Sequence, residues 1–106
     1  MGFTSKYTAE APELQEVQQT RGPLVLEFGT SWCGHCRAAQ PHIEEAFTSS
    51  DEIPHWKIED GKGRRLGRAF RVKLWPTLIF LRDGQEVERL VRPTDTPSIV
   101  RALGRL

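Results

Sequence analysis

The strongest strand signal in the chain is an almost continuous apolar run at residues 24–28, Leu-Val-Leu-Glu-Phe. A run without polar alternation indicates a strand that is covered on both faces, and such strands are typical of the centre of a parallel sheet. A second apolar run covers residues 77–82, and Asp83-Gly84 directly after it is a strong signal for a two-residue hairpin. Residues 85–91 are therefore expected to return antiparallel to that run.

Four further segments carry apolar residues at helical spacing, with helix-starting or helix-ending residues around them. Pro41 lies inside the segment at residues 33–48 and predicts a kink there. Residues 55–59 predict a weaker strand, and residues 3–7 a still weaker one. The helices are predicted at residues 9–21, 33–48 and 64–71, and from Thr96 as N-cap with Pro97 as the first helical residue.

The order of these elements alternates between helix and strand. Such alternation predicts an α/β architecture with parallel strands and one antiparallel edge, in which helices flank both faces of a central mixed sheet of four to five strands. The 106 residues are enough for one domain with one hydrophobic core, so residues 1–106 are expected to form a single domain.

Composition narrows the function classes only a little. Hydrophobic residues make up 38% of the chain and charged residues 27%, as in ordinary globular domains, and the formal net charge of +1 argues against a general nucleic-acid-binding protein. The longest apolar stretch, residues 78–81, is far too short to span a membrane. Three arginines share one face of the third predicted helix, which is either a solvated face or a surface for an acidic partner; they are Arg64, Arg68 and Arg71.

The two cysteines, Cys33 and Cys36, lie in one Cys-x-x-Cys where a strand ends and a helix begins. Backbone N–H groups at a helix start stabilise an anion, so the thiolate of Cys33, which is the nucleophilic form, is favoured there. Cys36 lies one turn further on the inward side of the helix. A pair at this spacing can close a disulfide, and Cys36 can resolve a mixed disulfide formed at Cys33.

Three other interpretations of the cysteine pair are weaker. A zinc site needs about four ligands, and none of the three histidines completes a second pair with metal-binding spacing. A structural disulfide closing so short a loop contributes only about 2 kcal/mol in the chain-entropy model. Two inert thiols in the core are disfavoured because Gly34 and His35, which lie between the cysteines, are not residues that fill a core. Metal binding is therefore not expected.

The stretch Trp32-Cys33-Gly34-His35-Cys36 resembles the active site of the thioredoxin superfamily, and its Gly-His pair is similar to that of protein disulfide isomerase domains. Pro41 matches the kink proline of the family helix, Trp75-Pro76-Thr77 the cis-proline loop, and Asp83-Gly84 the last hairpin. The resemblance covers nearly the whole chain. It implies a thioredoxin fold and a thiol–disulfide oxidoreductase. No cofactor is expected besides the redox-active Cys33–Cys36 disulfide.

The resemblance also implies roles for individual residues. Cys33 attacks the substrate disulfide, Cys36 resolves the mixed disulfide, and Glu27 matches the buried acid that handles the proton of the second cysteine, although the family commonly has aspartate there. Burial in an apolar strand is expected to raise the pKa of Glu27, unless its carboxylate reaches water at the strand end. Lys57 either pairs with Glu27 or is a solvated strand residue.

Residues around the cysteines are expected to bind substrate or to tune the redox potential. Pro76 in cis leaves the backbone of Trp75 free to pair with an extended substrate, and Trp32 and Trp75 offer an apolar surface. Gly34 and His35 are expected to set the potential, because an imidazole at the helix start stabilises a thiolate and makes the disulfide more oxidising. Trp56 is expected in the core; His42 and His55 are expected on the surface.

The favoured function is reduction or exchange of protein disulfides. The alternatives are a disulfide oxidase or isomerase in an oxidising compartment, favoured by Gly34-His35, and a protein-binding adaptor with incidental redox activity. A monomer is expected, supplied with electrons by a reductase or a small thiol; Leu74 and Arg92 depart from the family pattern and put recognition by a standard thioredoxin reductase in doubt. No export signal is recognisable near Met1, so the cytoplasm is expected, with a periplasmic or secreted mature domain as the alternative.

Overall fold

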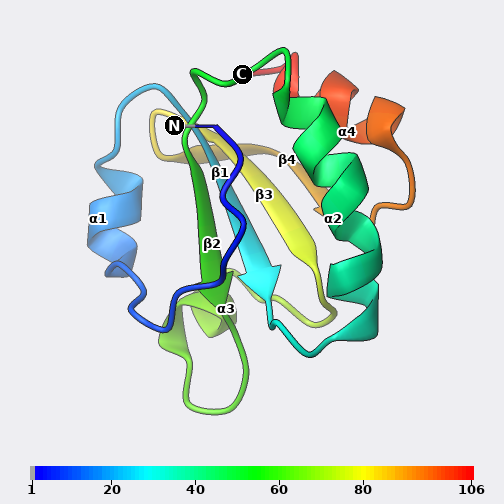
Figure 1. The fold of residues 1–106 in the computed structure, drawn as a ribbon. Helices are drawn as coiled ribbons and strands as arrows, with labels where there is room; N and C mark the ends of the chain where they lie inside the picture. Colours follow the sequence, from blue (N-terminus) through cyan, green and yellow to red (C-terminus); the bar gives the residue numbers. More distant parts are fainter. Residues whose placement is uncertain (1) are drawn as a thin grey trace.

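Four strands form one mixed sheet in the order β2-β1-β3-β4, with helices packed against it (Figure 1). The computed structural model describes residues 2–106; Met1, and with it the expectation about the chain start, lies outside the described residues. The elements in chain order are α1 (Leu14–Gln18), β1 (Pro23–Gly29), α2 (Gly34–Phe47), β2 (His55–Glu59), α3 (Arg65–Ala69), β3 (Thr77–Arg82), β4 (Gln85–Val91) and α4 (Thr96–Leu103).

Strand direction differs from the expectation of a parallel sheet with one antiparallel edge. The central strand β1 runs parallel to β2 but antiparallel to β3, and β3 runs antiparallel to β4. The chain between β2 and β3, residues 60–76, makes no crossover along the sheet. Its helix α3 has five residues, a length of about 8 Å, and does not run the length of the sheet. It lies at the end where β2 finishes, and β3 starts from that same end (Figure 1).

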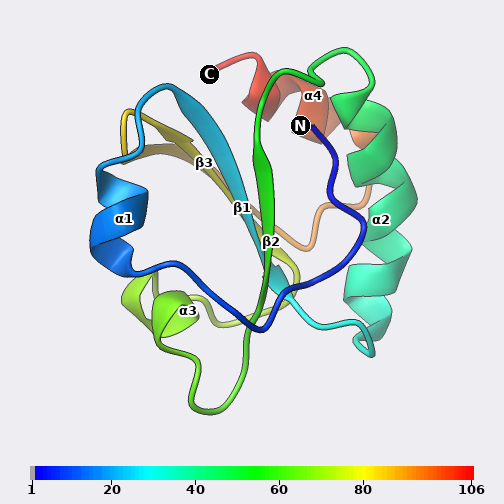
Figure 2. The same ribbon diagram turned by 60° about the vertical axis from the view of Figure 1, so that its left-hand side comes forward.

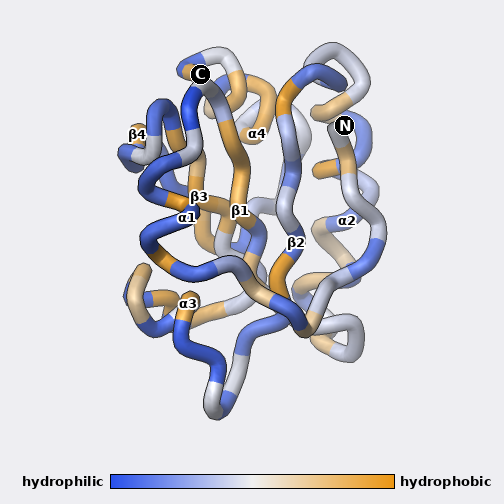
Figure 3. The backbone as a smooth tube through the Cα atoms, turned by 90° about the vertical axis from the view of Figure 1, so that its left-hand side faces the viewer, coloured by the Kyte–Doolittle hydropathy of each residue, from blue (hydrophilic) through white to orange (hydrophobic). Residues whose placement is uncertain are grey.

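Both faces of the sheet are covered, as the apolar run of β1 predicts (Figure 2). Alternate residues of β1 and β3 point to opposite faces. On the face under α2 and α4 the core contains Val25, Phe80 and Ile99. On the face under α1 and α3 it contains Leu26 and Ile79, together with Leu66 of α3. The hydropathy colouring in Figure 3 shows this concentration of apolar residues along β1 and β3.

Helix α2 spans nearly the predicted range and contains Pro41, whereas α1 and α3 are shorter than predicted. Helix α1 buries only Val17 completely, so packing supports little more than one turn of it. Helix α4 begins at Thr96, because the carboxylate of Asp95 accepts the Ser98 N–H at 2.7 Å. Asp95, one residue before the predicted Thr96, is therefore the N-cap.

The N-terminal segment, residues 2–10, runs beside the edge strand β2 without forming the strand predicted at residues 3–7 (Figure 1). It pairs with the β2 side of the sheet only through isolated bridges at Gly2 and Thr8. Between these bridges its backbone groups bond to side chains instead. The N–H of Thr4 donates to His55 Nδ1 at 2.8 Å, and the carbonyl of Ser5 accepts from Lys57 Nζ at 2.8 Å.

Within residues 2–106, none of the helices combines the length and the apolar character that a membrane crossing needs.

The two-sided core predicts that Leu26→Ala lowers the free energy of unfolding by about 2–5 kcal/mol, because Leu26 has no exposed surface and its truncation leaves a cavity in the sheet. The control is Val91→Ala on β4, where the side chain is 49% exposed. This control is expected to stay within about 0.5 kcal/mol of the wild-type protein. Urea unfolding followed by circular dichroism measures both, and equal effects of the two changes would contradict the assignment of the core.

Candidate active site

The two cysteines lie where the chain passes from β1 into α2, as predicted. Cys33 is the N-cap of α2, and its Sγ accepts the backbone N–H of Cys36 at 3.2 Å. This is a capping contact made by a sulfur atom, so the free N–H groups of the first turn point at Cys33. Both side chains are free thiols; Cys33 is 9% exposed and Cys36 only 1%. A reagent in solution therefore meets Cys33 first.

The Trp75–Pro76 peptide bond is cis, and the loop that contains it faces Cys33. The carbonyl of Trp75 lies 4.0 Å from Cys33 Sγ. It also accepts a hydrogen bond of 2.8 Å from Nε of Arg92. The expectation of a free Trp75 backbone is therefore wrong for the carbonyl, because a guanidinium that the cis-proline pattern does not predict already occupies it.

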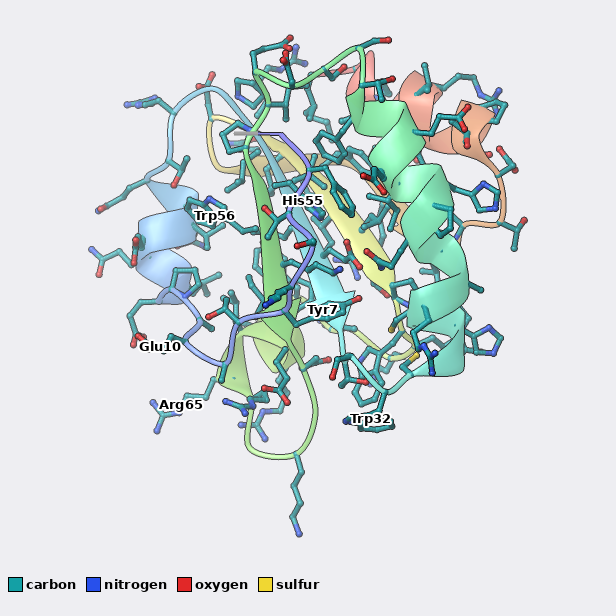
Figure 4. All side chains as sticks on the ribbon, in the orientation of Figure 1. Tyr7, Glu10, Trp32, His55, Trp56 and Arg65 are labelled. Atoms are coloured by element: carbon teal, nitrogen blue, oxygen red, sulfur yellow. The ribbon has the colours of Figure 1, made fainter. Side chains whose placement is uncertain are left out.

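Two tryptophans form the apolar rim of the site. Trp32 is 70% exposed and projects from the loop before α2 (Figure 4). Its ring meets Trp75 edge to face at 5.8 Å between centroids, and Trp75 Nε1 donates to Asp60 Oδ2 at 2.9 Å. Asp60 thus fixes one indole while the other remains open to solvent.

Gly34 and His35, the two residues between the cysteines, are exposed in the first turn of α2. A methyl group built on Gly34 would meet nothing within 4 Å. His35 borders a cavity of about 350 Å³ that also includes His42 and Arg92. His35 is therefore open to solvent at the start of α2.

Glu27 has no exposed surface, which excludes the alternative of a carboxylate reaching water. Three side chains contact it: Tyr7 Oη at 2.5 Å and Gln40 Nε2 at 2.9 Å from Oε2, and His55 Nε2 at 2.8 Å from Oε1. His55 Nδ1 accepts the Thr4 N–H, so the proton of this imidazole is on Nε2 and is donated to Glu27. All three neighbours are donors, which is the arrangement that an ionised carboxylate requires.

The pKa of Glu27 is lowered, not raised as the sequence led us to expect. Burial does raise it, but the hydrogen bonds from His55 and Tyr7 and the charge of Lys57 outweigh burial and hold the pKa of Glu27 below its ordinary value of 4.5. The carboxylate therefore adds stability above about pH 4.5. That stability is lost as the pH falls through the lower value of the folded state.

Lys57 is buried, so it is not a solvated strand residue. Within residues 2–106 it makes no ion pair with Glu27 either, although the two are register partners on β2 and β1. Its Nζ donates to Ser5 O at 2.8 Å and to Gln40 Oε1 at 2.6 Å, and lies 4.5 Å from the Tyr7 ring centroid. Gln40 thus connects the two charges. Burial lowers the pKa of Lys57 against the attraction of Glu27 and Cys36.

The expectation that His55 is a surface residue is wrong. His55 is 3% exposed, stacks on Phe47 at 4.9 Å and reaches Glu27 (Figure 4). It precedes Lys57 by two residues on β2, so both share the face under α2, whereas the half-buried Trp56 points toward α1. His42, also half-buried, lies 3.3 Å from Thr96 Oγ1. His55 and Lys57 are two residues apart on β2, and their side chains point to the same face of the sheet as Glu27 on β1. This alternation is the sequence signal that indicates the burial of His55.

Tyr7 and Gln40 were not singled out in the sequence. Gln40 follows Cys36 by one helical turn, and its Nε2 also donates to the Cys36 carbonyl at 2.8 Å. Tyr7 comes from the N-terminal segment and carries no local pattern that points to the site. Burial raises the pKa of the Cys36 thiol to about 11, a hydrogen bond with Cys33 adds to this, and hydrogen bonds from Thr30 and Tyr7 oppose it.

Within residues 2–106, no group of three or more His, Cys, Asp or Glu side chains is arranged to hold a metal ion. The redox-active group at this site is the cysteine pair itself.

Comparisons with known proteins agree with this geometry. The family model for thioredoxin matches residues 6–105. The structure of thioredoxin 2 from Pseudomonas aeruginosa PAO1 in its reduced form is 50% identical, with a TM-score of 0.85 over 98% of this chain and 100% of that one. A thioredoxin of Mycobacterium tuberculosis is 30% identical over 89 residues, which are 83% of this chain and 77% of the relative.

A thioredoxin H-type of Fagopyrum esculentum is 28% identical over 79 residues, which are 74% of this chain and 68% of the relative. The match to the family model covers nearly all of the chain, including both cysteines and the cis-proline loop. The dithiol at the start of α2 therefore performs thiol–disulfide exchange, and the chain belongs to the thioredoxin family of thiol–disulfide oxidoreductases.

Proposed function

We propose that this protein reduces protein disulfides, with Cys33 as the attacking thiolate, Cys36 as the resolving thiol and Glu27 as the acceptor of the Cys36 proton. The observation that supports this division most directly is the difference in access between the two sulfurs. Cys33 caps α2 at the rim of the site, whereas Cys36 is buried behind it. Glu27 is the carboxylate buried on the same side of the sheet.

The substrate proteins dock on the apolar rim that Trp32, Trp75 and the buried Pro76 form beside Cys33. Proteins of this family act on disulfide substrates and receive electrons from reductases; a small thiol is the other proposed donor for this chain. The compartment is the cytoplasm, where thiols are kept reduced, and the protein acts there as a monomer. Arg92 at the cis-proline carbonyl alters the surface that a reductase would meet.

Exposed His35 supports a second candidate, a disulfide oxidase or isomerase in an oxidising compartment. An imidazole in the first turn of α2 stabilises the Cys33 thiolate and so stabilises the reduced form. A protein-binding adaptor without redox activity is less well supported, because an adaptor has no use for a carboxylate held by three donors behind a dithiol.

The proposed division of roles predicts that iodoacetamide modifies Cys33 much faster than Cys36 at neutral pH. Cys33 is the more exposed of the two cysteines, and a pKa of about 11 leaves Cys36 only about one part in ten thousand as thiolate at pH 7. Peptide mapping by mass spectrometry after brief alkylation of the reduced protein identifies the modified residue. Preferential modification of Cys36 would reverse the two roles.

Glu27→Gln tests the proton acceptor. The amide keeps the size of the side chain but cannot take the Cys36 proton, so resolution of a Cys33 mixed disulfide is expected to slow by about 100-fold at neutral pH while the first attack by Cys33 keeps its rate. Stopped-flow kinetics with a model disulfide separates the two steps. Glu44→Gln, an exposed change on α2, is the matched control. Unchanged resolution in Glu27→Gln would remove Glu27 from the mechanism.

His35→Pro distinguishes the reductase from the oxidase. Thioredoxin has a potential near −270 mV and protein disulfide isomerase one near −180 mV, so we expect this protein to lie above the thioredoxin value. If His35 acts by stabilising the thiolate, replacing it by proline lowers both the potential and the thiolate fraction of Cys33, with about 30 mV for each tenfold change in the equilibrium. Glutathione-equilibrium and ultraviolet thiolate titrations of both proteins measure this; a potential that moves alone would mean a different cause.

A further inference from the structure

The hydroxyl of Tyr7 lies between the proposed base and the buried cysteine. Its Oη is 2.5 Å from Glu27 Oε2. A Cβ built on Gly29 would stand 2.6 Å from Tyr7 Oη and 2.6 Å from Cys36 Sγ, so these two atoms are no farther apart than twice that distance. Tyr7 reaches this place from the N-terminal segment, across β2 (Figure 4). The absence of a side chain on Gly29 leaves room for this approach.

The cysteine needs a path for its proton that Glu27 alone does not offer. At neutral pH Cys36 is a thiol, and its proton must leave as its sulfur attacks. The hydrogen bonds of Glu27 within residues 2–106 come from Tyr7, Gln40 and His55, and none joins it directly to Cys36. Tyr7 is therefore the group that is placed to connect the two.

The other neighbours of Glu27 cannot make this connection. Both ring nitrogens of His55 are engaged, one by the Thr4 N–H and one by Glu27. The amide nitrogen of Gln40 is shared between Glu27 and the Cys36 carbonyl, and its oxygen accepts from Lys57. A tyrosine hydroxyl, by contrast, donates one proton and accepts another, so it can bond to a carboxylate and a thiol together.

The phenol is also unsuited to act as a base itself. Burial raises the pKa of Tyr7 strongly, and the charge of Glu27 adds to that rise. Tyr7 therefore stays protonated and can give its proton to Glu27 only while it receives one. Tyr7 and Cys36 border one cavity, and the other titratable groups that line it are Lys6, Arg37 and Lys57; Cys33, whose Sγ accepts the Cys36 N–H, is the further titratable neighbour of Cys36.

We propose that Tyr7 is a proton relay between Cys36 and Glu27 during resolution of the mixed disulfide, an inference that rests on the proposed role of Glu27 as proton acceptor. The Cys36 proton moves to Tyr7 Oη while the Tyr7 proton moves to Glu27 Oε2. The sulfur electron pair of Cys36 forms the new bond to Cys33 Sγ. The bond between Cys33 and the substrate sulfur breaks, and its electron pair leaves with the substrate as a thiolate.

The proton on Glu27 returns by the same relay in reverse. Tyr7 and Cys36 border a cavity of about 410 Å³ that reaches the surface between the N-terminal segment and α2, past Ser5 and Arg37. Water in this cavity can take the proton from Tyr7 Oη once the disulfide has formed. The substrate thiolate takes up a proton from solvent, so the two steps together consume no further reactant.

Tyr7→Phe tests the relay, because it keeps the ring beside Lys57 and removes only the hydroxyl. The probe is dithiobis(nitrobenzoate): attack by Cys33 releases one nitrothiobenzoate, and resolution by Cys36 releases the second, so stopped-flow absorbance shows two phases. The first phase is expected to keep its rate. The second is expected to slow by about 10- to 100-fold at neutral pH and to rise with pH until it meets the wild-type rate.

Phe3→Leu is the matched control, since Phe3 lies on the same segment and packs against His55 and Lys57 but bears no hydroxyl. It is expected to leave both phases unchanged. Equal slowing in Phe3→Leu and Tyr7→Phe would show that only the packing of the segment matters, and would overturn the relay.

The double variant separates the relay from the base. Glu27→Gln slows the second phase if Glu27 is the base, and adding Tyr7→Phe then slows it no further if both act on one path. Slowing by Glu27→Gln but not by Tyr7→Phe, or fully multiplied effects, would overturn the relay alone. No slowing by Glu27→Gln would overturn the proposed function of Glu27 itself.

The wild-type protein provides a test that does not depend on any variant folding. The rate of the second phase is measured in mixtures of light and heavy water. If two protons are transferred together in this step, the rate is a curved function of the deuterium fraction. A straight line in the wild-type protein would contradict the relay, because it indicates transfer of a single proton.

Discussion

The arrangement of the active site depends on one buried negative charge. A carboxylate without exposed surface is costly unless donors surround it, and Glu27 is surrounded by a tyrosine, a glutamine and a histidine. These donors come from the N-terminal segment, α2 and β2, whereas Glu27 itself lies on β1. Four parts of the chain therefore meet at this carboxylate. That point lies directly behind Cys36, so the same contacts that satisfy the charge also shape the redox site.

The sequence carries much of the fold because several elements are determined locally. The apolar run of β1, the Asp83-Gly84 turn and the long stripe of α2 each predict their element without help from distant residues. Strand direction does not follow from local patterns, because it depends on the path that the connection between β2 and β3 takes in three dimensions. The segment 3–7 has the composition of a weak strand, but His55 and Lys57 take its backbone groups, and only tertiary structure reveals that competition.

The candidate site also contains residues that the sequence predicts and residues that it does not. The positions of Cys33 and Cys36 follow from one local motif, and the candidate role of Glu27 follows from its match to the family pattern within an apolar strand. The neighbours of Glu27 do not, because Tyr7 and His55 are 20 and 28 residues away along the chain. Desolvation alone predicts a raised pKa for Glu27; the hydrogen bonds from His55 and Tyr7 and the charge of Lys57 reverse the direction. The direction of such a shift therefore depends on contacts that a single strand sequence does not contain.

The hydrogen bond from Arg92 to the Trp75 carbonyl has a consequence for recognition. A main-chain N–H of a docking protein meets a carbonyl oxygen that already accepts one hydrogen bond, from a guanidinium of the same chain. For a partner that needs Arg92 displaced, the association constant is multiplied by the fraction of molecules in which Arg92 is displaced. A partner with a carboxylate beside its disulfide gives the released guanidinium a new ion pair, whereas a partner without one leaves it with water. Recognition at this carbonyl would then depend on the side chains of the partner and not only on its main chain, which is identical in every polypeptide.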